Sequence, residues 1–359
     1  MTTPSRVVVL TPVVGGRDGL SELSRQVITA SAGEGVPVTV LALAGAAHFS
    51  HPAASIELVS ARGHRARLVR HVAVDSLHWG RGTRVIVMHA NLLPLVLPAT
   101  LGRSEIVAVL VGIEAWRPLS VLERSALRRV QTVVAISAHT ASGFAAANPA
   151  FATSTVRICH PAVPELVPPL PADRAPGYAL MVGRMWSAER YKGHDRVLEA
   201  WPAVLASHPG ARLVVAGDGD DRPRLMARAA ALGVAPAVDF VGAVDDARLA
   251  ALYRGCAFFV MPSRDEGFGL VYLEAMRTGH ACIASPGAAA EFITHGVNGW
   301  LIDPGDVAAI AGACVRFLQD PTLTARLGPA AAATVCRDYQ FEQFAARWRQ
   351  ALAGLPAPC

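Results

Sequence analysis

The sequence predicts an α/β protein in which two doubly wound parallel sheets form separate domains that face each other across a cleft. Three observations lead to this fold class. The chain has 359 residues, enough for two domains of the usual size, roughly 100 to 200 residues. Short, almost wholly apolar segments alternate with helical patterns, as in parallel sheets that are covered on both faces. A proline-rich stretch divides these segments into two series.

The first series predicts an N-terminal domain over residues 1–165. Its strands are expected where β-branched and other apolar residues run together, at 7–10, 38–43, 85–88, 106–111 and 133–136. Prolines then follow one another closely from Pro161 to Pro176, and proline can continue neither a helix nor a central strand. We therefore assign residues 166–177 as the linker between the domains.

The second series predicts a C-terminal domain over residues 178–336. Its strands are expected at 179–182, 213–216, 238–241, 258–261, 282–284 and 300–302. The remaining residues, 337–359, include Phe341, Phe344, Trp348 and Leu352 at helical spacing, which predicts an amphipathic helix with one apolar face to bury. Because ligands of open parallel sheets bind beyond the carboxyl ends of the strands, we expect the active site in the cleft between the domains.

The composition excludes several classes of protein. Apolar residues make up 52% and charged residues 17% of the chain, but no apolar run reaches the ~18 residues that a membrane-spanning helix needs. The first ten residues lack the pattern of an export signal, so we expect a cytoplasmic protein. The six cysteines are scattered and include no Cys-x-x-Cys pair, which argues against a zinc site or a disulfide framework.

The positive charge lies in the first half of the chain. Residues 1–165 contain 15 basic and 9 acidic side chains, an excess of +6, whereas the rest contains 18 basic and 19 acidic ones. This asymmetry favours an anionic partner for the first half, namely acidic lipid, a phosphate-bearing acceptor or nucleic acid; a solvated basic surface is the alternative. Of the 33 basic residues only Lys192 is a lysine, and an ammonium suits a phosphate pocket too narrow for a guanidinium.

Candidate site residues follow the expected strands. Gly15 and Gly16 come after the first strand, but they lack the Gly-x-Gly-x-x-Gly spacing, so a dinucleotide site is disfavoured. Arg184 comes directly after the strand at 179–182, and Lys192 lies eight residues further on, where a helix begins. Two cations beside a helix N-terminus can hold a diphosphate without a metal ion; two unrelated surface cations are the alternative.

The strand at 258–261 leads into a loop that contains Glu266 and two glycines, and Glu274 follows eight residues after Glu266 on the next helix. A carboxylate at a loop tip can accept hydrogen bonds from sugar hydroxyls, backbone amides can meet phosphate or sugar oxygens, and a carboxylate in the first turns of a helix can bind ribose hydroxyls. Glutamates also occur at helix starts for dipole reasons alone. The whole combination is more specific than either glutamate by itself.

These motifs together resemble the retaining glycosyltransferases of family 4, which belong to the glycosyl transferases of group 1. The resemblance extends over nearly the whole chain. It implies a GT-B fold with an acceptor-binding N-terminal domain, a nucleotide-sugar-binding C-terminal domain, and a last helix that crosses back to the N-terminal domain. It implies no metal ion and no cofactor beyond the nucleotide sugar, and it gives nucleic acid no role.

The resemblance also implies roles for individual residues. Arg184 and Lys192 would bind the donor diphosphate and, with Glu266, form the catalytic group. Glu266 would hold hydroxyls of the transferred sugar. The further donor-binding residues would be Gly267, Phe268, Gly269 and Leu270 of the same loop, Glu274 at the ribose, Val238 and Phe240 at the nucleobase, and Gly16 at the diphosphate from the first domain.

The chain departs from the family at Val111. The family places a cleft histidine at the end of the strand before a Gly-x-Glu segment, and here Val111 precedes Gly112 and Glu114. We name His89, Val111 and Glu114 as candidate acceptor-side residues, with His89 as a substitute for the missing histidine.

The predicted function is a retaining, metal-independent transfer of a sugar from a UDP or GDP sugar to a hydroxyl acceptor. That acceptor is lipid-linked or a glycan, and the enzyme contacts the inner face of the membrane peripherally. A catalytically weak or inactive nucleotide-sugar-binding protein is the alternative that Val111 suggests. A nucleotide-sugar epimerase of the same architecture is a third interpretation.

Overall fold

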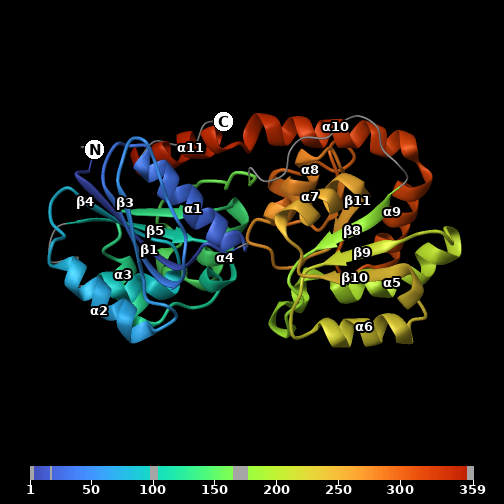
Figure 1. The fold of residues 1–359 in the computed structure, drawn as a ribbon, viewed down its shortest axis with the longest axis horizontal. Coiled ribbons are helices and arrows are strands. Elements are labelled where there is room, and N and C mark those ends of the chain that lie inside the picture. Colours follow the sequence, from blue (N-terminus) through green and yellow to red (C-terminus); the bar gives the residue numbers. More distant parts are fainter. Residues whose placement is uncertain (1–3, 17, 98–103, 165–176, 354–359) are drawn as a thin grey trace. The chain divides into compact units, whose positions relative to one another are not determined.

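A computed structural model describes residues 4–16, 18–97, 104–164 and 177–353. The chain divides into two compact units (Figure 1). Unit 1 consists of Met1–Ala162 and Phe341–Cys359, and unit 2 consists of Val163–Gln340. These divisions lie within four residues of the expected ends at 165 and 336. Of the expected linker at 166–177, all but Gly177 falls outside the described residues.

Unit 1 contains a seven-stranded parallel sheet in the order β3-β2-β1-β4-β5-β6-β7. The strands are β1 (Arg6–Val14), β2 (Val38–Gly45), β3 (Ile56–Ser60), β4 (Thr83–Val87), β5 (Glu105–Leu110), β6 (Thr132–Ala135) and β7 (Val156–Ile158). The five central strands coincide with the five expected ones. The edge strands β3 and β7 were not expected, because they are only partly buried and include polar residues such as Glu57 and Arg157.

Helical elements cover both faces of this sheet. They are α1 (Gly19–Ala32), α2 (Arg65–Ser76), η1 (Ala90–Val96), η3 (Ile113–Ala115), α3 (Val121–Leu127), α4 (Ala138–Ala147), η4 (Pro149–Phe151) and α11 (Phe341–Ala353). Asp18 caps α1, because its carboxylate accepts hydrogen bonds from the amides of Leu20 and Ser21, both at 3.0 Å. Helix α11 packs against α1 and β6, so the last described helix of the chain returns to unit 1.

One core cluster ties α2, η1, η3 and α3 to the same face of the sheet. It contains Val8 and Leu10 of β1, Leu68 and Val72 of α2, and residues of η1, η3 and α3. Because side chains alternate along a strand, Val7 and Val9 point to the opposite face of the sheet. The four helical elements therefore form one layer over one face of the unit 1 sheet.

Unit 2 contains a six-stranded parallel sheet in the order β10-β9-β8-β11-β12-β13. The strands are β8 (Tyr178–Val182), β9 (Leu213–Ala216), β10 (Val238–Gly242), β11 (Cys256–Met261), β12 (Cys282–Ala284) and β13 (Trp300–Leu301). The helical elements are η5 (Ser187–Lys192), α5 (His194–Ser207), α6 (Arg222–Ala231), η6 (Ala235–Ala237), α7 (Asp246–Gly255), α8 (Leu270–Arg277), η7 (Ala288–Glu291), α9 (Val307–Gln319) and α10 (Pro321–Asp338). Helix α5 packs against α6 and α9, and α8 packs against α10.

The expected fold class is confirmed, since each unit is a parallel sheet with helices on both faces (Figure 1). The order of the strands reverses between β1 and β4 in unit 1 and between β8 and β11 in unit 2. Loops that follow the strands at such a reversal diverge and leave room for a ligand. The loops after β8 and β11 are those in which the sequence placed Arg184, Lys192 and Glu266. No helix in the described ranges is long and apolar enough to cross a membrane.

Candidate functional site

The loops after β8 and β11 in unit 2 are in direct contact. Gly193 adopts φ +88°, and a Cβ atom there would lie 2.6 Å from the carbonyl oxygen of Pro262. The amide of Arg264 donates a hydrogen bond to the carbonyl of Tyr191 at 2.9 Å. Only glycine permits this approach, because any larger residue would both clash and be strained at positive φ. The contact fixes the two loops with respect to each other.

The ammonium of Lys192 lies 3.3 Å from both carboxylate oxygens of Glu266. The two side chains are 11% and 19% exposed. The hydroxyl of Ser263 also donates a hydrogen bond to Glu266, at 3.2 Å. The structure therefore brings together two residues that the sequence placed 74 positions apart, and it adds Ser263. This close ion pair could not be read from the separate motifs.

Arg184 follows β8 and pairs with a residue that the sequence did not single out. Its guanidinium donates a hydrogen bond to Glu189 at 2.5 Å and lies over the ring of Trp186, 4.6 Å from the ring centroid. The Arg184 side chain is 46% exposed, whereas Glu189 is largely buried. Both predicted phosphate-binding cations thus have a carboxylate partner: Glu189 for Arg184 and Glu266 for Lys192. An anion that enters the site would exchange with these carboxylates.

His194 does not add a third positive charge to this group. It is the first residue of α5 and is buried. Burial, together with the nearby Lys192 ammonium, lowers the pKa of His194 to about 4. The imidazole is therefore neutral near pH 7.

The glycine-flanked loop after Glu266 is held by a buried aromatic side chain. Phe268 packs against Phe292 and Tyr339, with ring centroids 5.2 Å and 6.1 Å away. Gly269 adopts φ +94° and precedes α8, and a Cβ atom there would lie 2.5 Å from the Tyr272 ring. The Phe268 side chain thus belongs to the core and anchors the loop, so that the loop can meet a ligand mainly through its backbone.

Glu274 lies on α8 and is oriented by Tyr253 of α7. The hydroxyl of Tyr253 donates a hydrogen bond to Oε2 of Glu274 at 2.7 Å. Burial and the neighbouring Glu274 charge raise the pKa of Tyr253 well above its ordinary value. The phenol therefore remains a protonated donor at all physiological pH values. No signal in the sequence marks Tyr253, because a buried tyrosine is also an ordinary core residue.

The predicted nucleobase residues do not all lie near these loops. Val238 begins β10 and pairs with Leu213 at the start of β9, so it lies at the amino ends of the strands, away from Arg184. Phe240 is in the middle of β10, and its carbonyl accepts a hydrogen bond from Arg222 at 2.9 Å. The structure therefore brings Arg184, Lys192 and the loop containing Glu266 to one end of the sheet but leaves Val238 at the other.

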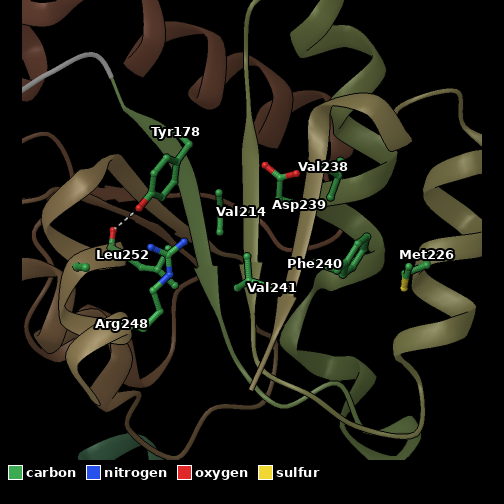
Figure 2. A pocket seen from close by; sticks show the side chains of 10 residues that line it. Tyr178, Val214, Met226, Val238, Asp239, Phe240, Val241, Arg248 and Leu252 are labelled. Carbon is green, nitrogen blue, oxygen red and sulfur yellow. Dashed lines mark hydrogen bonds between the residues drawn. The ribbon is translucent and has the colours of Figure 1, made fainter. Parts of the chain in front are cut away.

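Val238 and Phe240 instead line a cavity of about 550 Å³ around the edge strand β10 (Figure 2). Tyr178 and Arg248 also line this cavity, and the Tyr178 hydroxyl donates a hydrogen bond to the carbonyl of Leu252 at 2.9 Å. No predicted phosphate- or sugar-binding residue is among the lining residues. We therefore do not assign this cavity to the candidate site.

The acceptor-side candidates gather at the carboxyl ends of β4 and β5 in unit 1. His89 follows β4, Val111 follows β5, and the two strands are neighbours. The amide of Val111 donates a hydrogen bond to the carboxylate of Glu114 at 2.7 Å. Burial lowers the pKa of His89, against the opposing charge of Glu114. The structure thus brings the three residues together, with a neutral histidine beside a carboxylate.

Gly16 lies in the turn between β1 and α1 of unit 1, whereas the other predicted donor residues belong to unit 2. A Cβ atom at Gly16 would lie 2.7 Å from the Asp18 carboxylate and from the Ser21 hydroxyl. A side chain at this position would therefore crowd the cap of α1. In the part of the chain that the structure describes, no three His, Cys, Asp or Glu side chains gather to form a metal site.

Comparison with known proteins identifies the family to which this chain belongs. Residues 176–320 match the family described as Glycosyl transferases group 1. The chain is 30% identical over 282 residues to a GDP-mannose-dependent alpha-(1-6)-phosphatidylinositol monomannoside mannosyltransferase of Mycolicibacterium smegmatis, and the match covers 70% of this chain and 71% of that protein. The chain therefore belongs to the glycosyl transferases of group 1.

Other similarities cover less of the relative or show the fold alone. The chain is 34% identical over 171 residues to a glycogen synthase of Mycobacterium tuberculosis, a match that covers 47% of this chain and only 41% of that protein. The crystal structure of Anabaena HepE in complex with UDP-glucose superimposes with a TM-score of 0.77 at 20% identity, over 98% of this chain and 100% of HepE. These neighbours support the GT-B assignment of the two Rossmann-like sheets.

Proposed function

We propose that this protein is a metal-independent, retaining glycosyltransferase that moves a sugar from a UDP or GDP sugar to a hydroxyl acceptor. One observation carries the proposal: the ion pair of Lys192 and Glu266 lies where the strand order reverses, with Arg184 on the same loop. A cation for the diphosphate and a carboxylate for the sugar thus lie 3.3 Å apart. Two groups this close can be met together by one ligand in which a sugar is joined directly to a diphosphate, once that ligand separates them.

Donor binding would change the hydrogen-bond partners of Lys192, Arg184 and Glu266. Phosphate oxygens would take the place of Glu266 at Lys192 and of Glu189 at Arg184. Glu266 would then be free to accept hydrogen bonds from hydroxyls of the transferred sugar, while Glu274, oriented by Tyr253, accepts them from the ribose. Charge-assisted hydrogen bonds are replaced by bonds of the same kind, so the exchange itself costs little.

The two cations would also lower the barrier of the reaction. Negative charge grows on the diphosphate as the bond between the anomeric carbon and the phosphate oxygen breaks, and Arg184 and Lys192 stabilise that charge in the transition state. The acceptor oxygen would form its bond to the anomeric carbon on the same face, and its proton would pass to the departing phosphate. Configuration is then retained without a protein nucleophile. In this scheme Glu266 keeps its hydrogen bond from Ser263 after the phosphate has replaced it at Lys192, and it acts as a hydrogen-bond acceptor for the sugar.

We assign the acceptor to unit 1, near His89 and Glu114. A hydroxyl on a lipid-linked molecule or a glycan fits the proposal, since the relative from Mycolicibacterium smegmatis is named for a phosphatidylinositol monomannoside acceptor. The +6 excess of residues 1–165 supports an anionic or membrane-bound acceptor. The place of action would be the cytoplasmic face of a membrane, with peripheral contact.

A second candidate function is nucleotide-sugar binding with little or no turnover. Val111 favours it, because its branched side chain cannot donate or accept the hydrogen bond that a histidine would offer to the sugar. The preserved contacts of Arg184, Lys192, Glu266 and Glu274 weigh against it. The two candidates differ in whether the donor is consumed when an acceptor is present.

The first prediction concerns Tyr253, whose role in orienting Glu274 can be separated from its role in the core. Tyr253→Phe should weaken the binding of UDP or GDP by about threefold to tenfold, because the lost hydrogen bond orients Glu274 and does not itself contact the ligand. It should leave the binding of the matching 2′,3′-dideoxyribonucleotide unchanged, because that ligand offers Glu274 no hydroxyl. Isothermal titration calorimetry measures both.

Tyr272→Phe is the matched control for this experiment. Its hydroxyl is equally buried, but it donates to the carbonyl of Met261 at 2.6 Å. Equal losses for the ribo- and dideoxyribonucleotide, or equal losses in both variants, would show that Tyr253 acts only through stability.

The second prediction concerns turnover and metal ions. Consumption of UDP-glucose or GDP-mannose should rise when a glycan or lipid-linked hydroxyl acceptor is added, and the rate should persist in EDTA, because Arg184 and Lys192 neutralise the departing diphosphate. Proton NMR of the product should show the anomeric configuration of the donor. A rate that EDTA abolishes and Mg²⁺ or Mn²⁺ restores would contradict metal independence, and an inverted product would contradict the proposed mechanism.

The third prediction concerns Val111. Val111→His should change the preference among donor sugars more than it changes nucleotide affinity, since the residues around the diphosphate are untouched. The reason is that a new imidazole favours a sugar with a hydroxyl within its reach and leaves a polar group unpaired with any other sugar. Measured kcat/KM values for several donors test this. An equal gain for every donor would instead show that Val111 lowers activity in general.

A further inference from the structure

The outer surface of the helical layer formed by α2, η1, η3 and α3 is both apolar and basic. These four elements bury side chains in one core cluster, and α2 and α3 both contact η1, so their outward sides lie over the same face of the unit 1 sheet. Of the nine large hydrophobic side chains that are exposed in the described residues, five belong to these elements and a sixth, Leu77, directly follows α2; the five are Val69, Val74, Ile113, Val121 and Leu122. We call these six residues, together with Arg65, Arg67 and Arg70 of α2, the α2–α3 surface.

Helix α2 shows the arrangement most clearly. Leu68 and Val72 point into the core and are each 2% exposed. Arg70, Val74 and Leu77 follow at spacings of four and three residues, so they form one stripe on the outward side of the helix. Val74 is 56% and Leu77 82% exposed. A surface helix ordinarily places polar residues on this side, whereas α2 has a second apolar stripe there, accompanied by arginines.

The charge of this surface is positive because two of its three carboxylates, Asp75 and Glu123, are paired; the third, Glu114 of η3, accepts a hydrogen bond from the amide of Val111. Asp75, the one acidic residue of α2, accepts hydrogen bonds from Arg6 at 2.6 Å and from the Trp79 indole at 2.7 Å. Glu123 of α3 binds Arg117 at 2.7 Å, and this arginine lowers the pKa of Glu123 to about 2.

No side-chain hydrogen bond or ion pair engages the guanidinium groups of Arg65, Arg67 and Arg70 within the described residues. All three side chains are exposed. The outward charge of α2 is therefore positive and available to a partner.

We propose that the α2–α3 surface docks onto an anionic lipid bilayer, with the arginines at the headgroups and Val74 and Leu77 inserted among the first carbons of the acyl chains. Arginines contribute attraction to acidic headgroups, and exposed aliphatic side chains gain free energy only in an apolar medium. A nucleic acid would satisfy the arginines but would leave the valines and leucines in water. The pairing of both features on one surface therefore favours the bilayer. This inference rests on the proposed function in one respect: docking on the bilayer would bring the enzyme to a lipid-linked acceptor.

Vesicle flotation with the full-length chain tests this docking. Vesicles of pure phosphatidylcholine are compared with vesicles that contain about one third phosphatidylglycerol, an anionic lipid. We expect the protein to float with the anionic vesicles, to stay behind with the neutral ones, and to bind less as salt is added, because salt screens the attraction to the headgroups.

Two sets of variants separate the charged from the apolar contribution. Replacing Arg65, Arg67 and Arg70 by Gln should lower partitioning into anionic vesicles by roughly a hundredfold, about fivefold for each charge removed. Val74→Ser combined with Leu77→Ser should lower it by roughly tenfold, because two aliphatic side chains no longer leave water. All five side chains are exposed, and unchanged thermal unfolding would confirm that the variants fold.

Matched controls come from unit 2. Met226→Ser combined with Val297→Ser removes two exposed hydrophobic residues, and replacing Arg248, Arg254 and Arg326 by Gln removes three exposed charges. Neither control should change flotation by more than about twofold, because these residues lie outside the α2–α3 surface. Non-specific adsorption would depend on total charge and would fall equally in the controls.

Three results would overturn the proposal: no flotation with anionic vesicles, an equal loss in the surface variants and the controls, or no effect of the Val74 and Leu77 changes. The last result, together with retention of duplex DNA that depends on the arginines, would show a nucleic-acid surface instead. UDP and GDP affinity of the same variants is measured separately. Normal nucleotide binding with failed flotation rejects the docking alone, whereas normal flotation with no nucleotide binding rejects the proposed function alone.

Discussion

The ion pair between Lys192 and Glu266 is the interaction on which the rest of the candidate site depends. It joins the loop after β8 to the loop after β11, where the strand order of unit 2 reverses. Both side chains are largely removed from water, so each needs the other as a partner when no ligand is present. The close contact of Gly193 with Pro262 sets the distance between the two loops. In the proposed function, this ammonium and this carboxylate are thereby held ready for the two halves of a sugar diphosphate.

Arg184 and Glu274 are also each positioned by a partner side chain. In the proposed function, the ligand displaces the partner of Arg184 and leaves the partner of Glu274 in place. Glu189 holds Arg184, and a phosphate would replace it. Tyr253 holds Glu274 through an oxygen that faces the core, and a ribose would leave that bond intact. Such preorganisation lowers the entropy cost of binding, because few side chains need to be ordered when the donor arrives.

The sequence alone predicted the two-sheet architecture and the loops of the site well, for physical reasons. Strands buried on both faces have continuous apolar sequences, and residues that follow parallel strands must lie at one edge of the sheet. It failed where a residue's role depends on a distant contact. The edge strands β3 and β7 carry polar residues and so lack the continuous apolar sequence of a buried strand. The roles of Tyr253 and Glu189 become apparent only from their contacts with Glu274 and Arg184 in the structure. The family resemblance led us to place Val238 at the nucleobase, but the strand register puts it at the amino ends of the strands.

Calorimetric titration of a nucleoside diphosphate into Lys192→Ala, Lys192→Arg and the unmodified chain tests the central claim most directly. Loss of the ammonium should weaken affinity by about tenfold to a hundredfold, the range for one charge-assisted hydrogen bond. Arginine should not restore it, because a planar guanidinium cannot take the place of a compact ammonium at the same point between the two loops. Arg196→Ala, in the first turn of α5 and paired with Glu199 at 2.8 Å, is the matched control and should bind normally. Unchanged affinity in Lys192→Ala, or an equal loss in Arg196→Ala, would contradict the assignment of the diphosphate to this ion pair.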